Sequence, residues 1–485
     1  MRRGDIIETE KIFSKKGEAM IRFGTGGFRG VIGEDFDKAN VQLIAQGLAE
    51  VSRAEKNDKP VAVGYDYRFI SDRAAVWVSE VLAANGIRVL LFDGAMPTPA
   101  IMYAVKENEL NYGVMITASH NPYYFNGVKL FLKGGVDADV NFTQRLEKVI
   151  DGISEVKTVP LESAKSSGLV QMYNDIDSYL GFIRKFISPG IVNNTAKILY
   201  DNLNGVGAVC LTKLAEKLNI KQFDVRNSGH DAFFGFSLPN PTREMMEPLS
   251  GIVRREGYDF AIATDSDGDR LGIIDEQGRY VDSNTILGAL YYYLCRYRGE
   301  KGDVVKNCAT SLLLDKLAAK LGYKCHEVDV GFKNISRKMA ETDALIGGES
   351  SGGLTVRGYI KGKDSVFSSA LFMEMVIMMK KPVSEIVREV YDFAEYSLDA
   401  DEKTLSLSGF DGVEKYLTEN APALSEKVLE IKHFGRNYKY ILKNGWALLR
   451  MSGTEPAIRI FAETDSREQT DKIIGEIVDD LKKYA

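Results

Sequence analysis

The sequence has few cysteines and no long apolar run, and these absences exclude several classes of protein. Its four cysteines, Cys210, Cys295, Cys308 and Cys325, have no CxxC spacing, which argues against a zinc site and a disulfide framework. The most apolar late run, ALFMEMVIMM, is short and interrupted by Glu374, so no membrane-spanning segment is expected. The first residues, MRRGDIIETEKIF, contain charge but no apolar leader core. We therefore expect a protein of the reducing cytoplasm.

The chain also lacks a strong excess of either charge. It has 62 Lys and Arg residues against 68 Asp and Glu residues, a net charge of -6, so we expect no surface for nucleic acid or an anionic membrane. With 485 residues and 45% hydrophobic content it is long enough for several cores, and no low-complexity tract separates them. The expected partner is a small molecule that a local basic pocket could bind. The protein is expected to be a monomer or a homodimer.

Apolar runs alternate with helical patterns along most of the chain. Residues 61–66 are typical of a buried strand, residues 71–86 of a helix and residues 87–94 of a second strand. The same alternation returns at 196–264 and at 303–379. Such repetition predicts three successive α/β units with parallel or mixed sheets, which bind ligands at the carboxyl ends of their strands.

The last part of the chain has a different pattern. A charged stretch at 396–404 is interpreted as a linker, segments 427–453 and 457–464 as strands, and 466–485 as an amphipathic helix. This pattern predicts a smaller α+β module. The expected domains are 1–155, 156–283, 284–390 and 391–485. Each contains one polar segment: the serine loop at 117–129, the metal loop at 264–270, the sugar loop at 347–353 and the phosphate loop at 450–456.

The segment TDSDGDR follows the apolar DFAIA directly. Its carboxylates Asp265, Asp267 and Asp269 alternate along the chain and could converge on one hard cation such as Mg²⁺. A solvated acidic turn would look similar. An EF-hand is excluded, because Arg270 stands where its loop needs glycine, although Glu276 occupies the twelfth position. An aspartyl-phosphate nucleophile stays open at this point.

Two glycine-rich segments contain polar side chains. FGTGGFRG is not a dinucleotide loop, because Arg29 replaces its last glycine, and it predicts either a structural turn or an exposed arginine aimed at an anion. GGESSGG presents Glu349 and Ser351 at a strand end, where a carboxylate could accept two sugar hydroxyls. A flexible linker would have a similar composition.

The segment RMSGTEP is a candidate phosphate loop. Arg450, Ser452, Gly453, Thr454 and the nearby Arg459 combine guanidinium groups, hydroxyls and a glycine between two predicted strands. Backbone N–H groups and hydroxyls can surround a phosphate, and arginine can bind it with two hydrogen bonds. An ordinary hairpin loop is the alternative.

The segment TASHNPYYFNGVK places a serine beside a histidine at a strand end. Ser119 and His120 precede an Asn-Pro turn, and Lys129 is expected across a hairpin at Asn126 and Gly127. Neither a catalytic triad nor a G-x-S-x-G elbow is visible, so acyl transfer is a poor fit. A phosphorylated serine with Mg²⁺ and cations around the transferring oxygens fits better, since phosphoryl transfer requires positioning and charge neutralisation.

Four motifs in this order, TASHNP, DSDGDR, GESSGG and SGTEP, resemble those of the α-D-phosphohexomutase superfamily. The resemblance covers nearly the whole chain and is strongest to bacterial-type phosphoglucomutases. It implies a heart-shaped, four-domain fold with three related α/β mixed-sheet domains and a C-terminal α+β domain like the TATA-binding protein. It also implies an isomerase, an intramolecular phosphotransferase that interconverts 1-phospho and 6-phospho sugars.

The same resemblance assigns roles to residues. Ser119 would carry the phosphoryl group and, with the three aspartates, bind one Mg²⁺ per chain. His120, Lys129 and Arg29 would assist transfer, and glucose 1,6-bisphosphate would be the intermediate and activator. The other implied contacts are Glu349, Ser351, Gly331 and Lys333 for the sugar, Arg450, Ser452, Gly453, Thr454 and Arg459 for the non-reacting phosphate, and Arg270 and Lys306 in support.

Departures from the family pattern concern the substrate. Gly353 stands where phosphomannomutase and phosphoglucosamine mutase types commonly have histidine, VGFK resembles a phosphoglucomutase segment, and Lys306 resembles an arginine there. Glucose phosphate is therefore the first expectation. A phosphomannomutase or dual-specificity enzyme is the alternative, because a loop that contacts O3 and O4 does not distinguish mannose from glucose. A phosphoglucosamine mutase is expected less, and a non-catalytic sugar-phosphate-binding homologue least. An aspartyl-phosphate enzyme would leave TASHNP unexplained.

Overall fold

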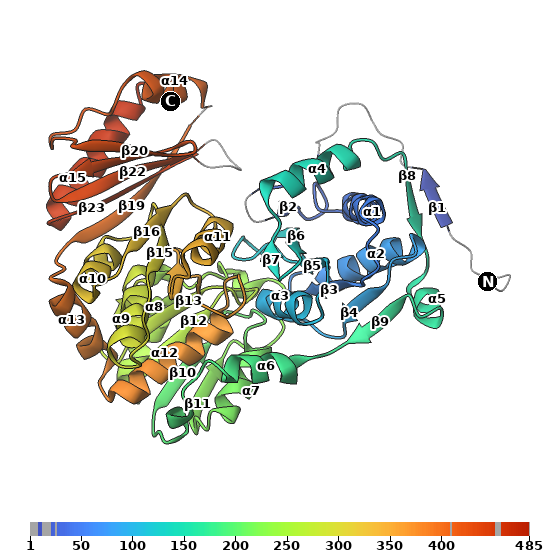
Figure 1. The fold of residues 1–485 in the computed structure, drawn as a ribbon, viewed down its shortest axis with the longest axis horizontal. Coiled ribbons are helices and arrows are strands. Elements are labelled where there is room, and N and C mark those ends of the chain that lie inside the picture. Colours follow the sequence, from blue (N-terminus) through green and yellow to red (C-terminus); the bar gives the residue numbers. More distant parts are fainter. Residues whose placement is uncertain (1–7, 12–20, 25–26, 408–409, 452–456, 485) are drawn as a thin grey trace. The chain divides into compact units, whose positions relative to one another are not determined.

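The computed structural model of the protein describes residues 8–11, 21–24, 27–407, 410–451 and 457–484. The chain divides into two compact units that do not follow chain order (Figure 1). The first unit contains Met1–Ile286 and Ser351–Ile386, and the second contains Leu287–Ser350 and Val387–Ala485. The expected four domain boundaries stay a prediction.

The first sheet of the first unit is mixed. Its strands are β2 (Phe28–Val31), β3 (Val61–Tyr65), β4 (Val89–Phe92), β5 (Tyr112–Ile116), β6 (Phe125–Leu132), β7 (Val136–Asp137) and β9 (Val170–Tyr173). They are ordered β2-β6-β5-β3-β4-β9, with β7 beside β6, and β6 runs antiparallel to both β2 and β5. The accompanying helices are α1 (Lys38–Ala54), α2 (Ser71–Ala84), α3 (Thr98–Glu107), α4 (Val140–Ile150) and α5 (Leu161–Ser166), and β1 (Glu8–Lys11) pairs with β8 (Glu155–Thr158).

The second sheet of this unit has the order β11-β10-β12-β13-β14. Its strands are β10 (Lys197–Asp201), β11 (Gln222–Arg226), β12 (Phe260–Thr264), β13 (Leu271–Asp275) and β14 (Tyr280–Val281). The first unit also contains α6 (Ile176–Arg184), η1 (Pro189–Val192), α7 (Ala208–Lys217), η2 (Phe234–Phe236), α8 (Arg243–Glu256), β18 (Leu354–Val356) and α12 (Ser365–Met379). Helix α12 is apolar almost all round because it is nearly fully buried, and Asp364 caps its first turn by accepting the Phe367 N–H at 2.9 Å.

The second unit contains a parallel arrangement and an antiparallel sheet. Strands β15 (Val304–Asn307), β16 (Cys325–Val328) and β17 (Ile346–Gly348) pair in parallel, with α10 (Leu313–Leu321) and α11 (Phe332–Thr342) between them in the chain. The tail sheet has the order β19-β23-β22-β21-β20. Its elements are β19 (Asp399–Ser406), α14 (Asp411–Glu419), β20 (Glu430–Phe434), β21 (Asn437–Leu442), β22 (Gly445–Met451), β23 (Ala457–Thr464) and α15 (Arg467–Leu481). Helices α9 (Ser283–Arg296) and α13 (Val383–Ala394) cross the boundary between the units.

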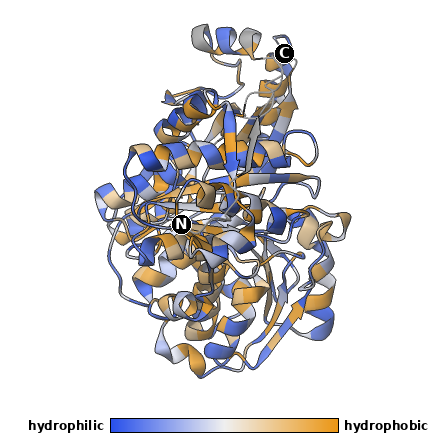
Figure 2. Cartoon of the chain, turned by 90° about the vertical axis from the view of Figure 1, so that its right-hand side faces the viewer, coloured by the Kyte–Doolittle hydropathy of each residue, from blue (hydrophilic) through white to orange (hydrophobic). Residues whose placement is uncertain are grey.

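Buried aliphatic side chains fill the interior of each unit, and Figure 2 shows the hydrophobic residues gathered along the strands. The parallel strands β3, β5 and β12 are apolar almost throughout, as expected for strands covered on both faces. In the described part of the chain, no helix is both long and apolar enough to span a membrane.

The expected linker at 396–404 is wrong. Residues Asp399–Ser406 form β19, which pairs antiparallel with β23 along its whole length. Its side chains are mostly exposed because β19 is an edge strand, so backbone hydrogen bonds hold it without an apolar alternation.

The expected hairpin at Asn126 and Gly127 is also wrong, because both residues lie inside β6. The buried Asn126 side chain donates to Phe69 O at 3.1 Å and to Ser71 Oγ at 2.9 Å. Arg29 does not stand on an exposed turn: it lies in β2, partly buried, opposite Gly127. Glycine is required there, since a Cβ on Gly127 would approach a β2 carbonyl oxygen to 2.3 Å.

Candidate active site

Two polar loops of the first unit meet at one place. The loop with Ser119 follows β5, and the loop with Asp265, Asp267 and Asp269 follows β12, so each begins at the carboxyl end of a strand. Ser119 Oγ of one loop lies 3.3 Å from Asp265 Oδ2 of the other, and Thr98, the first residue of α3, donates its hydroxyl to Asp267 Oδ2 at 2.6 Å. The expected nucleophile and the expected metal ligands are therefore neighbours.

The Ser119 side chain points at the acidic loop. Its hydroxyl donates to Asp265 Oδ2 at 3.3 Å, and His120 Nδ1 lies 3.4 Å from the same Oγ. Ser119 is buried and adopts a left-handed backbone conformation with φ of 53°, which is uncommon for a residue other than glycine. The surrounding contacts must hold it there.

The three aspartates fit a hard divalent cation. One carboxylate oxygen from each of Asp265, Asp267 and Asp269 lies within 4.8 Å of the others, and all three residues are buried. Among the residues that the structure describes, no hydrogen-bond donor reaches Asp267 Oδ1 or Asp269 Oδ1. Buried carboxylate oxygens without donors are unusual, and they are the ligands that Mg²⁺ prefers.

Three cations surround these carboxylates. Lys129 Nζ lies 2.5 Å from Asp267 Oδ2 and 3.1 Å from Asp269 Oδ2. Lys363 Nζ lies 3.2 Å from Asp269 Oδ2. Arg270 Nε approaches the carboxylates less closely, at 3.8 to 3.9 Å. A group that carries several negative charges, such as a phosphoryl group, would meet cations here.

The pKa values of Asp265 and Asp269 are shifted in opposite directions. Burial, followed by the charges of Asp269 and Asp267, raises the pKa of Asp265 well above its ordinary value. Burial opposes ionisation of Asp269 as well, but Lys129 and Lys363 lower the pKa of Asp269 below its ordinary value. The two carboxyl groups therefore differ because only one has close ammonium partners.

The pKa values of His120 and Lys129 are also shifted in opposite directions. Burial, then the charge of Arg270, lowers the pKa of His120 well below its ordinary value, so its imidazole is neutral at pH 7. Burial alone would lower the pKa of Lys129, but Asp267 and Asp269 raise it, so the ammonium stays charged. Arg29 extends from β2 and donates to Asn121 Oδ1 in the serine loop at 2.5 Å.

Several predicted sugar and phosphate residues lie in the second unit. Glu349 Oε1 accepts hydrogen bonds from the Gly331 N–H and Asn307 Nδ2, both at 3.2 Å. Arg450 on β22 stands opposite Arg459 on β23. Ser351 lies in the first unit and is exposed, whereas Ser452, Gly453 and Thr454 lie outside the described residues.

The two predicted lysines of the second unit differ. Lys306 is fully buried, and its ammonium donates to Thr310 O at 3.3 Å, Ser311 O at 3.0 Å and the Asp315 carboxylate. Lys333 is partly exposed in the first turn of α11 and makes no ion pair or hydrogen bond with any described residue. Lys333 is therefore the one available to a ligand.

Sequence reasoning missed Lys363, Thr98 and Arg68 in the first unit. Lys363 forms an ion pair with Asp269 of the metal loop, and Arg68 donates to the backbone carbonyl of Ser119. Arg68 follows the buried strand VAVGY with Asp66, a polar pair at a strand end, and this pattern could have indicated it.

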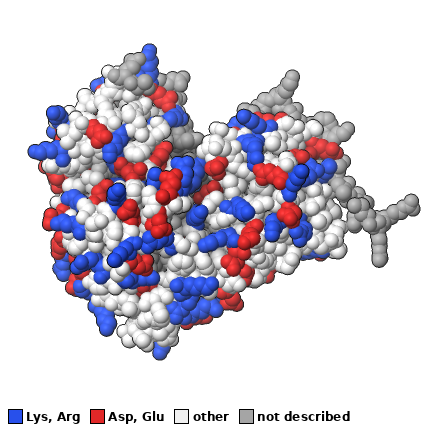
Figure 3. All heavy atoms as spheres, viewed as in Figure 1, with Lys and Arg blue, Asp and Glu red and all other residues white. Residues whose placement is uncertain are grey.

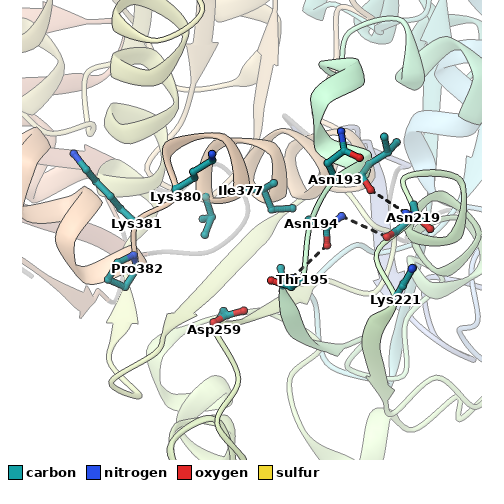
Figure 4. A pocket seen from close by; sticks show the side chains of 13 residues that line it. Asn193, Asn194, Thr195, Asn219, Lys221, Asp259, Ile377, Lys380, Lys381 and Pro382 are labelled. Atoms are coloured by element: carbon teal, nitrogen blue, oxygen red, sulfur yellow. Dashed lines mark hydrogen bonds between the residues drawn. The ribbon is translucent and has the colours of Figure 1, made fainter.

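A hollow of about 690 Å³ opens elsewhere in the first unit (Figure 4). It lies where Ala196, Lys221 and Asp259 precede β10, β11 and β12, at the amino ends of these strands, whereas the acidic loop follows the carboxyl end of β12. Asn194 and Asn219 at its edge are engaged with backbone oxygens. The face seen in Figure 3 mixes both charges, so no broad basic surface identifies a macromolecular partner there.

Comparisons with known proteins match four segments of the chain to models of one protein family. Residues 20–157, 177–278 and 282–393 match domains I, II and III of phosphoglucomutase/phosphomannomutase, described as alpha/beta/alpha domains, and residues 410–480 match the C-terminal domain. The chain belongs to the α-D-phosphohexomutase superfamily. It is an intramolecular phosphotransferase with three α/β domains and a C-terminal α+β domain.

Individual relatives cover almost the entire chain. A phosphoglucomutase/phosphomannomutase of Thermococcus kodakarensis is 28% identical over 92% of this chain and 95% of its own length. A phosphoglucosamine mutase of Carboxydothermus hydrogenoformans is 26% identical over 95% and 99%. A solved structure described as a phosphomannomutase from Thermus thermophilus aligns with a TM-score of 0.83 at 26% identity, over 96% of this chain and 99% of that one. Their names differ in the sugar.

Proposed function

We propose that this phosphohexomutase is a phosphoglucomutase, which interconverts glucose 1-phosphate and glucose 6-phosphate through a phosphoserine and a glucose 1,6-bisphosphate intermediate. The observation that carries the proposal is the 3.3 Å approach of Ser119 Oγ to Asp265 Oδ2 within the group of three buried carboxylates. A hydroxyl beside a cation-binding group suits phosphoryl transfer, which depends on positioning and charge neutralisation.

The donor-free oxygens of Asp267 and Asp269 support Mg²⁺ as the metal. Asp265, Asp267, Asp269 and an oxygen on Ser119 would hold it. Bound there, Mg²⁺ would neutralise charge on the transferring phosphoryl group. The cations of the chain, Lys129 above all, would add to this neutralisation.

His120 is proposed to move the proton at Ser119 Oγ. Its low pKa leaves the imidazole neutral and able to accept a proton, and Nδ1 lies 3.4 Å from the hydroxyl oxygen. Lys129 cannot serve as this base, because its raised pKa keeps the ammonium charged. We assign Lys129 and Arg29 to stabilising the phosphoryl oxygens, with Arg270 in support.

The second unit is proposed to bind the sugar and the phosphate that is not reacting. Glu349 would accept hydrogen bonds from two sugar hydroxyls. Gly331 and Lys333 of the second unit, and Ser351, would contribute further contacts. Arg450 and Arg459, together with Ser452, Gly453 and Thr454, would bind the phosphate. Burial, then repulsion by Arg459, lowers the pKa of Arg450, and a phosphate between the two guanidinium groups would relieve that repulsion.

The packing of Lys363 on Gly353 supports glucose as the sugar. A Cβ on Gly353 would lie 2.1 Å from Lys363 Cδ, so no histidine fits at position 353 while Lys363 keeps its place. Lys363 then presents its ammonium 3.2 Å from Asp269 Oδ2. In this chain Lys363 therefore fills the space beside Gly353, the position at which mannose and glucosamine types commonly have histidine. The names of the relatives keep phosphomannomutase, dual-specificity and phosphoglucosamine mutase activities as alternatives.

The test compares kcat/KM for glucose 1-phosphate, mannose 1-phosphate and glucosamine 1-phosphate, with Mg²⁺ and a trace of the matching bisphosphate. We expect the highest value for glucose 1-phosphate. A higher value for glucosamine 1-phosphate would refute the substrate and leave the phosphotransferase intact. Omitting the bisphosphate should introduce a lag if turnover needs a phosphorylated Ser119.

A further inference from the structure

Arg68 inserts its guanidinium into the serine loop from the side of β3. The side chain is buried, and its NH1 group donates to Pro122 O at 2.8 Å and Phe125 O at 3.0 Å. Its NH2 group donates to Asn121 O at 2.6 Å and to Ser119 O. One planar guanidinium therefore contacts four backbone carbonyl oxygens within seven residues, which a fork of five N–H donors allows.

Asp66 is linked to the Ser119 backbone through Thr117. Its Oδ2 accepts the Thr117 hydroxyl at 2.6 Å, and Thr117 Oγ1 in turn accepts the Ser119 N–H at 2.8 Å. The same Oδ2 lies 3.4 Å from Arg68 Nε, while Oδ1 accepts the Arg68 N–H at 3.0 Å. The Ser119 carbonyl therefore accepts from Arg68 directly, and the Ser119 N–H is linked to Asp66 through the Thr117 hydroxyl.

Two contacts from the second sheet complete this arrangement. Ser266 donates its hydroxyl to Ser119 O and lies 3.4 Å from Arg68 NH2, which links the guanidinium to the metal loop. The Phe234 ring covers the guanidinium, with its centroid 5.0 Å from the central carbon. No contact places Arg68 on Ser119 Oγ, so it acts on the backbone.

We propose that Arg68, supported by Asp66, is a positioning residue that holds Ser119 in its left-handed backbone conformation and so directs Oγ at Asp265. A left-handed backbone conformation is unfavourable for serine and persists only where its surroundings impose it. The inference rests on the proposed role of Ser119 as the group that carries phosphate. It predicts that loss of Arg68 slows phosphoryl transfer and leaves sugar binding intact.

The test uses Arg68→Lys in the full chain. Lysine keeps the charge that faces Asp66, but its three N–H groups radiate from one nitrogen and cannot span four carbonyls. The control is Arg279→Lys in the same unit, where an arginine makes one close ion pair, Nε to Asp275 Oδ2 at 2.8 Å. We would measure kcat and KM with the best of the three sugar phosphates, the thermal midpoint, and Ser119 phosphorylation by glucose 1,6-bisphosphate.

We expect Arg68→Lys to lower kcat about 100-fold, the effect of a misplaced reacting group, and to change KM less than about threefold. Phosphorylation of Ser119 should slow in parallel, and the control should stay within about twofold of wild type. A folded Arg68→Lys variant with unchanged kcat, or with a loss seen in KM alone, overturns the proposal.

If Arg68→Lys does not fold, the proposal is tested with Thr117→Val instead. This substitution removes the hydroxyl that accepts the Ser119 N–H and keeps the shape of the side chain. A fall in kcat of about tenfold at constant KM supports the proposal, and wild-type kcat overturns it. Wild-type protein that is active but labelled away from Ser119 overturns the proposed function and this inference together. Labelling at Ser119 with a fully active Arg68→Lys variant overturns this inference alone.

Discussion

Replacing Lys129 by methionine should separate the role of its charge from the role of its length. Lys129 Nζ contacts Asp267 Oδ2 at 2.5 Å and Asp269 Oδ2 at 3.1 Å, and the side chain is only 8% exposed. Methionine fills a similar volume but leaves Asp267 without an ammonium partner and Asp269 with that of Lys363 alone. Removing one partner of a buried ion pair costs about 3 to 5 kcal/mol, so we expect the first unit to lose about 3 kcal/mol in chelator.

Mg²⁺ binding should restore most of the free energy of unfolding that Lys129→Met loses in chelator. A ligand that binds only the folded state at 100 times its Kd adds about 2.7 kcal/mol to the free energy of unfolding. Lys129 and Mg²⁺ compete for the negative charge of Asp267 and Asp269, so Mg²⁺ should bind Lys129→Met more tightly than wild type and stabilise it more. Turnover should still fall, because the ammonium would no longer face the transferring phosphoryl group.

The two tryptophans make this measurement specific for each unit. Trp77 lies in the first unit and Trp446 in the second, so a Trp446→Phe background follows urea unfolding of the first unit by Trp77 fluorescence. The control is Lys306→Met in a Trp77→Phe background, since Lys306 is also a buried lysine that pairs with a carboxylate, here the partly exposed Asp315. The control should be destabilised without recovery in Mg²⁺. Equal Mg²⁺ shifts in wild type and Lys129→Met would refute the reasoning.

Four further outcomes are expected. Ser119→Ala should abolish turnover and change stability by no more than about 1 kcal/mol, since the two hydrogen bonds that its hydroxyl loses, to Asp265 and His120, are both long, and phosphopeptide mapping that places label on an aspartate would contradict it. Asp267→Asn should raise the Mg²⁺ concentration for half-maximal activity about tenfold or more, whereas full activity in excess chelator would exclude a metal role. Gly353→His should cost about 1 to 3 kcal/mol by overpacking, measured by urea unfolding, and adding Lys363→Gly should relieve that loss; an unaffected single variant would disprove the packing argument. Burial raises the pKa of Asp364 to about 6, so the folded state retains a proton that the unfolded state releases, and stability should fall by about 1.4 kcal/mol as pH rises from about 5 to about 7.5. Asp364→Asn should lack this fall in the same urea titrations, and parallel pH curves for the two proteins would refute it.

The metal loop could be predicted because its signal is local. An apolar strand followed by aspartates at alternate positions requires only that the loop bend, and in the structure the oxygens of Asp265, Asp267 and Asp269 lie within 4.8 Å of one another. The alternation of strands and helices was equally informative, since a 2-residue or 3.6-residue period is set by each element itself. The charged edge strand β19 gave no such signal, because its stability comes from pairing with β23.

Contacts between segments distant in the sequence could not be predicted from such local patterns. Lys363 reaches the metal loop across 94 residues, and nothing in its own neighbourhood marks its ammonium as part of a site. Asn126 and Gly127 had the composition of a turn, yet tertiary packing placed them in β6, where the amide side chain is buried and a Cβ would clash. Arg29 was predicted in an exposed turn for the same reason, since pairing with β6 cannot be read from its flanking glycines.

The serine loop shows why a motif indicates chemistry more reliably than geometry. TASHNP supplies the hydroxyl and the imidazole, but the backbone conformation that aims Ser119 depends on Asp66 and Arg68, 51 residues or more away, and on Ser266, 147 residues away. These residues make no contact with Oγ. A chain could therefore keep the four motifs and lose the orientation of its nucleophile through one substitution at Arg68. Such a chain should still bind sugar phosphates while transferring the phosphoryl group slowly, because binding and positioning are carried by different residues.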